Sequence, residues 1–142
     1  RTAKAEWRGD LRSGGGEVDT ESGALVKVPY SFGTRFGDQR GANPEELIAA
    51  AHAACFAMAF ANTLSQKGHK PQSVQVQASC ILSRKEEGGF AITGMDLEAK
   101  VRAPSLSPGE LEAIAKEAEA GCPVSNVLRP GLEIRMKAEL AS

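Results

Sequence analysis

The stretch that decides the fold is NPEELIAAAHAACFAMAF, residues 43–60. Asn43 is a favourable helix N-cap, and Pro44 suits the first helical position because its missing N–H would have no partner there. Two glutamates follow in the first turn, where negative charge complements the helix dipole. We therefore predict a helix that runs from Asn43 to about Lys67 and ends at Gly68.

The middle of this predicted helix is apolar on nearly every face. Twelve residues, Leu47 to Met58, contain one polar member, His52. A helix of this kind is expected to be buried all round. In a small domain such burial needs a partner chain or a wrapped sheet, so we expect a homodimer. The same run holds Cys55, which raises the question of what a thiol would react with in an apolar helix.

The N-terminal part of the chain predicts short strands. Alternation in KAEWRGDL, residues 4–11, is followed by three glycines and then by EVDTESGALVKV, residues 17–28. We expect a hairpin or meander over residues 3–27. Residues 29–42, PYSFGTRFGDQRGA, have the composition of a loop, and loops of such polar content are common locations for sites.

The C-terminal part predicts a hairpin, two helices and a strand. Residues 73–86 and 87–103 both alternate, with KEEGG as the turn, which indicates a long antiparallel hairpin. A second helix is expected to begin at Ser105 or Ser107 and to end at Gly121, and a short third helix to follow Cys122. GLEIRMKAEL closes the chain as a strand. The order predicts one α+β domain over residues 1–142.

Composition limits the classes of function. The formal net charge is −1, so nothing favours a nucleic acid or an anionic membrane as partner. No apolar run approaches the ~20 residues that a membrane span needs, and the first ten residues lack the apolar core of a signal peptide. Three cysteines without CxxC spacing suit a thiol protein of the reducing cytoplasm better than a disulfide framework.

Each cysteine has a structural and a chemical interpretation. Cys55 is either a small buried hydrophobe or a reactive thiol, and His52, one helical turn earlier, is either its base or a packed, hydrogen-bonded residue. Cys122 precedes Pro123 at a predicted helix N-terminus, where a thiolate is favoured, unless it is a cap of no consequence. Cys80 lies on the apolar face of an alternating strand and indicates core packing. No pair has the short chelating spacing of a structural zinc site.

Taken together, residues 43–60 and AGCPVSNVL, residues 120–128, closely resemble the OsmC/Ohr family of thiol peroxidases, in its OsmC branch. Further matching segments are WRGD at 7–10, TESG at 20–23, YSFGTRF at 30–36 and GFAIT at 89–93. The resemblance therefore covers nearly the whole chain.

The resemblance implies reduction of organic hydroperoxides, and less readily of hydrogen peroxide, to alcohol and water in oxidative or osmotic stress defence. By motif position Cys55 would be the peroxidatic cysteine and Cys122 the resolving one, while Arg35 would activate the first thiolate and Glu45 would pair with that arginine. It also implies an intertwined homodimer, with antiparallel sheets wrapped around long central helices and active sites at the subunit interface. No metal, flavin or haem would be required, and a dithiol, a lipoyl group among the candidates, would be the reductant.

One geometric argument is independent of the resemblance. Glu45 and Cys55 are ten residues apart (55 − 45), which is ~15 Å along a straight helix. One arginine side chain spans only part of that distance. We therefore predict that Arg35 and Glu45 serve the Cys55 of the other subunit, unless the helix starts late or breaks so that residues 43–46 fold back.

Two alternatives from other classes remain open on the sequence. One is a thiol protein that does not turn over peroxide, such as a disulfide reductase or redox sensor. The other is a dimeric binding module for an apolar ligand. A papain-like protease does not fit, because the sequence has no CGSCW-type signature and His69 lies at a predicted helix end without an evident partner.

Overall fold

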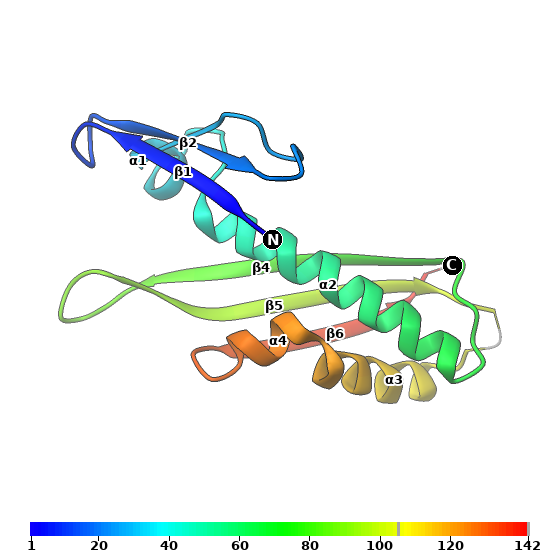
Figure 1. Cartoon of the computed structure of the whole chain (residues 1–142). Helices are drawn as coiled ribbons and strands as arrows, with labels where there is room; N and C mark the ends of the chain where they lie inside the picture. The colour runs from blue at the N-terminus through cyan, green and yellow to red at the C-terminus, as the bar shows by residue number, and fades with distance from the viewer. Residues whose placement is uncertain (105, 142) are drawn as a thin grey trace. The chain divides into compact units, whose positions relative to one another are not determined.

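The computed structural model describes residues 1–104 and 106–141. The chain divides into two compact units, Arg1–Leu47 and Ile48–Ser142. The elements are, in order, β1 (Ala3–Arg8), β2 (Gly15–Thr20), β3 (Val28–Ser31), α1 (Phe32–Phe36), α2 (Pro44–Gln66), β4 (Ser73–Arg84), β5 (Phe90–Arg102), α3 (Pro108–Gly121), α4 (Pro123–Leu128) and β6 (Glu133–Leu140). The prediction of an α+β fold is confirmed (Figure 1).

The first unit contains an antiparallel meander in the order β1-β2-β3. Strands were predicted over this region, but the glycine run does more than punctuate them, because Gly15 and Gly16 belong to β2. Gly16 lies opposite Trp7 on β1 and Tyr30 on β3. A Cβ added at Gly16 would lie 2.6 Å from the Tyr30 ring, so the absent side chain makes room for the tyrosine.

The prediction of a loop over residues 29–42 is wrong in its first half. Residues up to Ser31 belong to β3, and α1 follows at once. The Ser31 hydroxyl accepts a hydrogen bond from the Thr34 N–H at 3.2 Å, and the Thr34 hydroxyl accepts one from the Ser31 N–H at 2.9 Å. This capping box stabilises a single helical turn that the glycines and aromatics of the segment concealed. The turn carries Arg35.

Helix α2 begins and ends where the sequence predicts. The Asn43 side chain accepts a hydrogen bond from the Glu46 N–H at 2.8 Å, and the helix continues without interruption to Gln66. Gly68 follows with a φ of +86°, a value that favours glycine. The alternative of a helix that starts late or breaks is therefore wrong.

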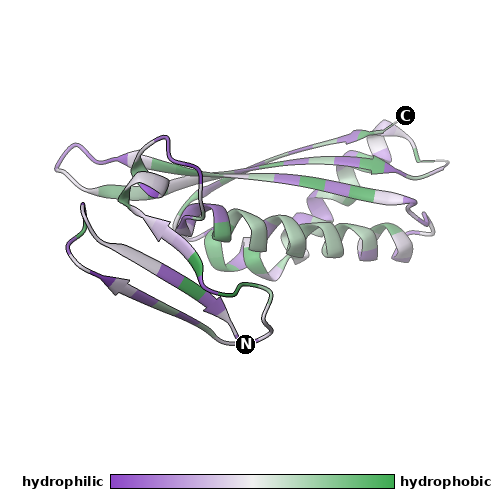
Figure 2. Cartoon of the chain, turned by 90° about the horizontal axis from the view of Figure 1, so that it is seen from above, coloured by the Kyte–Doolittle hydropathy of each residue, from purple (hydrophilic) through white to green (hydrophobic). Residues whose placement is uncertain are grey.

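Only one face of α2 is buried within the chain, so the prediction of all-round burial is wrong for a single copy. His52, Phe56, Phe60 and Leu64, which recur every fourth residue, are fully buried. The opposite face is exposed, with Met58 exposed at 75%. The physical reason is that the unit's own sheet and helices supply a partner for one stripe only. Apolar colouring nonetheless continues along the helix (Figure 2).

The length of α2 also corrects the expectation about membrane spans. By length and composition α2 is apolar enough to cross a membrane, with a mean hydropathy of 1.6. Core helices of water-soluble proteins also meet these criteria of length and hydropathy. Phe56 and Phe60 of α2 pack in the core of their own unit.

The second unit is built on the sheet β4-β5-β6, with α2, α3 and α4 on one side of it (Figure 1). The long hairpin β4–β5 is confirmed, with a bulge between Ile81 and Leu82, and β6 runs parallel to β5. Alternate residues of β5 enter the core. The fully buried members from β5 are Met95, Leu97, Ala99 and Val101. Cys80 packs against this core from β4, as the strand pattern predicts.

Helix α3 joins the core through one apolar face. Ser107 is the N-cap and forms a capping box with Glu110, while the alternative Ser105 lies outside the described residues. The buried face of α3 consists of Leu111, Ile114, Ala115 and Ala118. Cys122 then ends α3 and caps α4, so the cysteine is held between two helices.

We expect Phe60→Ala to lower the free energy of unfolding by ~3–5 kcal/mol, because it leaves a cavity under α2 that the sheet cannot fill. Urea unfolding at fixed protein concentration measures this loss. Phe90→Ala is the matched control: Phe90 is 50% exposed at the start of β5, and its truncation should cost clearly less. Equal losses for the two variants would contradict the assignment of the core.

Candidate active site

Two cysteines that are distant in the sequence meet in the second unit. The Cys55 Sγ on α2 lies 3.4 Å from the Cys122 Sγ at the α3–α4 junction. Both thiols are free in this structure. A disulfide needs a separation of about 2.05 Å between the sulfurs, so a small shift of either side chain would join them.

The two sulfurs differ in their access to solvent. Cys122 is fully buried, whereas Cys55 is partly exposed and lines a cavity of about 530 Å³ between α2 and α3. Met58, Ala59 and Ala118 form apolar parts of the same wall. A molecule that approaches the pair through this cavity therefore reaches Cys55 first.

Burial is the largest influence on the Cys55 thiol and raises its pKa. The Val124 N–H acts in the opposite direction, and the nearby Cys122 adds to the rise. Burial also opposes the ionisation of Cys122. Interactions of Cys122 with the Ser125 backbone N–H and hydroxyl, with Cys55 and with Val124 nevertheless bring the pKa of Cys122 below its usual value. The hydrogen-bond donors at the start of α4 therefore favour a thiolate at Cys122.

The chain geometry at α4 explains this difference. Pro123 occupies the first position of α4 and has no N–H, so the first free N–H groups of the helix belong to Val124 and Ser125. Both act on the Cys122 sulfur. The lowered pKa of Cys122 agrees with the sequence prediction of a stabilised thiolate at this position.

His52 contacts Ser125 in the structure, whereas the sequence suggested Cys55 as its neighbour. Its Nε2 lies 2.7 Å from the Ser125 Oγ, and both residues are fully buried. This contact favours the packed, hydrogen-bonded interpretation of His52 over a base for Cys55. Burial lowers the pKa of His52, with Glu119 and Arg129 acting in opposite directions, so the imidazole is neutral at pH 7. Sequence reasoning missed Ser125, because it lies 73 residues after His52 and no sequence pattern links the two positions.

Arg35 and Glu45 form a close pair in the first unit. The Arg35 Nη2 donates to Glu45 Oε1 at 2.7 Å, and the Arg35 Nε donates to both carboxylate oxygens at 3.2 Å. Glu45 is buried, with 7% exposure, and the guanidinium also stacks over the Phe36 ring at 5.0 Å. The carboxylate fixes the orientation of the guanidinium.

The sequence-predicted residues thus form two pairs, one in each compact unit. Cys55 lies with Cys122, and Arg35 lies with Glu45. Among residues 48–104 and 106–141, we find no cation whose charge lowers the pKa of Cys55. No group of three or more metal-ligating side chains occurs among the described residues.

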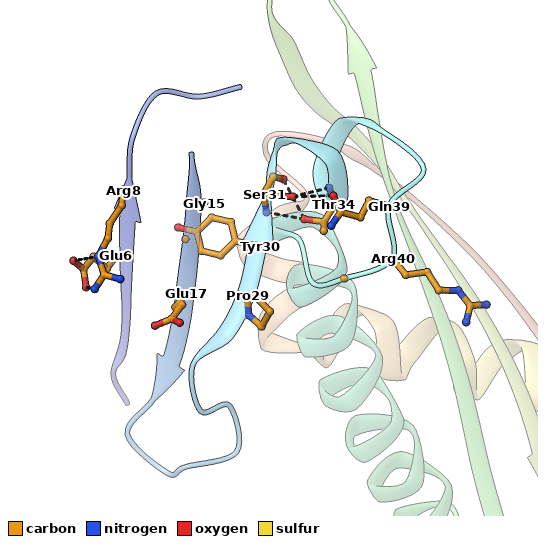
Figure 3. A pocket seen from close by; sticks show the side chains of 12 residues that line it. Glu6, Arg8, Gly15, Glu17, Pro29, Tyr30, Ser31, Thr34, Gln39 and Arg40 are labelled. Atoms are coloured by element: carbon orange, nitrogen blue, oxygen red, sulfur yellow. Dashed lines mark hydrogen bonds and ion pairs between the residues drawn. The ribbon is translucent and has the colours of Figure 1, made fainter. Parts of the chain in front are cut away.

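A second cavity, of about 370 Å³, lies in the first unit and contains no cysteine (Figure 3). It is bordered by the meander and the segment that follows α1, with Tyr30, Glu17 and Arg40 among its lining residues. Its lining combines charged and hydrogen-bonding side chains with apolar surface.

Comparison with known proteins identifies the family. The family model described as OsmC-like protein matches residues 37–137, a span that includes both cysteines of the close pair. The chain belongs to the OsmC family. It is 44% identical to "Peroxiredoxin OsmC" of Escherichia coli (strain K12) over 142 residues, which covers 100% of this chain and 97% of that protein.

Other OsmC and Ohr proteins match over most of their length. The "Organic hydroperoxide resistance protein" of Xanthomonas axonopodis pv. citri is 30% identical over 95% of this chain and 92% of its own. The structure of an organic hydroperoxide resistance protein from Elizabethkingia anophelis has a TM-score of 0.74 at 27% identity, covering 99% and 97% of the two chains. OhrB of Bacillus subtilis shares the fold, with a TM-score of 0.73 at 23% identity over 98% of each chain.

We expect one equivalent of cumene hydroperoxide to convert the reduced OsmC chain to a form with a single Cys55–Cys122 disulfide, because these sulfurs are already 3.4 Å apart. Peptide mapping by mass spectrometry without reductant identifies the linked peptides. Cys80→Ser is the control and should give the same product. A disulfide that includes Cys80, or no disulfide at all, would contradict the assignment of the pair.

Proposed function

We propose that this protein reduces organic hydroperoxides, and more slowly hydrogen peroxide, through Cys55 as the peroxidatic and Cys122 as the resolving cysteine. The chain is a peroxidase by its membership in a family whose relatives carry the names peroxiredoxin and organic hydroperoxide resistance protein. The observation that supports the cysteine mechanism best is the 3.4 Å sulfur pair, of which the partly exposed member lines a cavity.

The reaction proceeds in three steps. The Cys55 thiolate attacks the distal peroxide oxygen, an S–O bond forms as the O–O bond breaks, and the leaving alkoxide takes up a proton to become the alcohol. The Cys122 thiolate then attacks the sulfenic acid of Cys55, and hydroxide leaves as water. The disulfide protects Cys55 from further oxidation, until a dithiol reopens it by exchange.

The cavity beside Cys55 favours a hydroperoxide with a hydrocarbon group. Met58, Ala59 and Ala118 offer apolar surface close to the sulfur. Each methylene that leaves water for such a surface contributes ~0.8 kcal/mol to binding. Hydrogen peroxide has no hydrocarbon group and gains none of this energy, so it is the poorer substrate.

Cys55 needs a cation, because burial keeps its thiol protonated. Glu45 and Cys55 lie on the same uninterrupted helix, ~15 Å apart along its axis, and Glu45 holds the Arg35 guanidinium. One guanidinium cannot pair with Glu45 and reach the Cys55 of the same straight helix. We therefore assign the activation of each Cys55 to Arg35 of the partner subunit, which remains fixed by its own glutamate.

The exposed face of α2 supports a homodimer. Ala50, Ala54 and Met58 recur every fourth residue and are exposed on the side opposite the core. Small alanines allow another helix to approach closely, and a continuous apolar stripe on a water-soluble chain is typical of an interface. In the proposed dimer both compact units of each chain act as one intertwined OsmC domain, with the active sites at the subunit interface.

The reductant enters on the Cys55 side. Cys55 is the sulfur that borders the cavity, and Cys122 is the better leaving group because donors at the start of α4 stabilise its thiolate. A dithiol such as a dihydrolipoyl group would attack Cys55 and release Cys122. This cycle suits the cytoplasm, where dithiol reductants are maintained, and a role in oxidative or osmotic stress defence.

Turnover of cumene hydroperoxide with dihydrolipoamide tests the proposal. We expect multiple turnovers for the wild type and for Cys80→Ser, and a loss of at least ~100-fold in Cys55→Ser, which lacks the nucleophile. A redox sensor would react once and stop. A binding module for apolar ligands would show no turnover and would keep its ligand affinity in Cys55→Ser, and either result would overturn the proposal.

Co-expression of two inactive variants tests the activation across the dimer. Arg35→Ala and Cys55→Ser should each be inactive alone, but mixed dimers place an intact arginine beside an intact Cys55. We expect about one quarter of the wild-type rate, because half of randomly formed dimers are mixed and each has one complete site of two.

The control for this experiment is co-expression of Cys55→Ser with Cys122→Ser. These two residues meet within one chain, so no mixed dimer regains a complete pair and the rate should stay at the background level. Absence of recovery in the first mixture, with mixed dimers verified by two affinity tags, would mean that Arg35 acts within its own chain.

A further inference from the structure

The fully buried His52–Ser125 contact has no part in the mechanism above, although it adjoins the resolving cysteine. The imidazole Nε2 on α2 lies 2.7 Å from the Ser125 hydroxyl on α4, and Ser125 follows Cys122 by three residues. Burying two polar side chains is costly unless each satisfies the other. A leucine and an alanine would fill the same space without that cost, so the polar pair needs an explanation.

The hydrogen atoms of the pair determine its effect on Cys122. The Ser125 hydroxyl interacts with both the His52 Nε2 and the Cys122 sulfur. It has one hydrogen, which can point to either of them. It points to His52 when Nε2 is bare, and it is free for Cys122 when Nε2 carries the proton and donates to the Ser125 oxygen. The tautomer of His52 therefore controls whether the hydroxyl serves the sulfur.

The environment of His52 selects the tautomer. The His52 Nδ1 is buried and has no hydrogen-bond partner within the described part of the chain. A proton on Nδ1 would leave an N–H donor buried without an acceptor, and such orphaned donors are rarer in proteins than under-used acceptors. The proton is therefore placed on Nε2, which donates to Ser125.

Charged groups around the imidazole do not change this assignment. Glu119 on α3 and Arg129 after α4 are the charged residues that act on His52, and they are joined to each other at 2.6 Å. Their effects on the pKa of His52 oppose each other, and burial dominates. The imidazole is thus a neutral donor at the pH of the reaction.

We propose that His52 and Ser125 are positioning residues for the resolving step: His52 Nε2–H orients the Ser125 hydroxyl so that its hydrogen faces the Cys122 sulfur and stabilises the thiolate. This inference rests on the proposed function for its place in the cycle. Cys122 then attacks the sulfenic sulfur of Cys55. The S–S bond forms as the S–O bond breaks, Cys122 is oxidised as Cys55 is reduced, and hydroxide leaves as water with the proton that Cys122 gave up.

The same pair favours the return step. When a dithiol attacks Cys55 in the disulfide, Cys122 departs as a thiolate, and the Ser125 hydroxyl receives it with its hydrogen already in place. His52 and Ser125 thus act on both the formation and the opening of the disulfide. Neither touches the peroxide, because both are fully buried while the cavity is lined by Cys55.

A direct titration of Cys122 tests the inference without peroxide. In the Cys55→Ser/Cys80→Ser protein, Cys122 is the single thiol, because the chain has three cysteines. Absorbance at a thiolate wavelength against pH gives its pKa. Adding Ser125→Ala should raise this pKa by about one unit, the scale of a hydrogen bond to a charged group. Adding His52→Leu should raise it similarly, and His52→Gln, whose amide can donate, should recover part of the shift.

Single-turnover kinetics in the Cys80→Ser protein test the role in the cycle. Ser125→Ala and His52→Leu should slow disulfide formation about tenfold near neutral pH and move its pH profile upward by about one unit, because the thiolate is the nucleophile. The earlier phase, in which Cys55 becomes the sulfenic acid, is followed by trapping with dimedone. A purely structural defect would slow both phases and leave the pH profile in place.

The chain offers matched controls for both substitutions. His69→Leu removes the other histidine, which lies after α2, and Ser65→Ala removes an α2 hydroxyl that donates to the Ala61 carbonyl. Neither control should move the pKa of Cys122. An unchanged pKa in Ser125→Ala, with native circular dichroism, would overturn the inference. A raised pKa in a protein that never turns over peroxide would instead overturn the proposed function alone.

Discussion

The contact between the Cys55 and Cys122 sulfurs depends on how one face of α2 is buried. The stripe of His52, Phe56 and Phe60 fixes the rotation of the helix about its axis, because these side chains fill the space above β5 and beside α3. Cys55 directly precedes Phe56, so this rotation places it at the edge of the core, between the buried stripe and solvent. A helix rotated by one residue would bury Cys55 or expose it fully.

The second constraint is the junction between α3 and α4. Cys122 ends one helix and begins the next, so its backbone is held from both sides and its side chain has little freedom to leave α2. Pro123 removes one N–H and directs the next two toward the sulfur. The junction therefore provides position and electrostatics together, which a cysteine within a continuous helix would lack because all its neighbouring N–H groups are already bonded.

The two thiols experience opposite electrostatic environments although they are in contact. Cys122 has nearby hydrogen-bond donors and is fully buried. Cys55 borders the cavity and loses hydration, and no cation among residues 48–104 and 106–141 lowers its pKa. A thiol that burial keeps protonated is activated by an opposite charge nearby. The fixed Arg35–Glu45 pair is suited to that purpose, because its guanidinium is already oriented.

The sequence by itself determined most of the elements and the candidate residues for the thiol chemistry. Asn43, Pro44 and the spacing of apolar residues fix α2 through local hydrogen bonds and side-chain period, and the two cysteine motifs are specific enough to indicate the family. Only the tertiary structure decided which face of α2 is buried and that His52 meets Ser125. The reason is that local propensity is a property of neighbours in the chain, whereas a contact between residues 52 and 125 depends on the packing of α2 against α4.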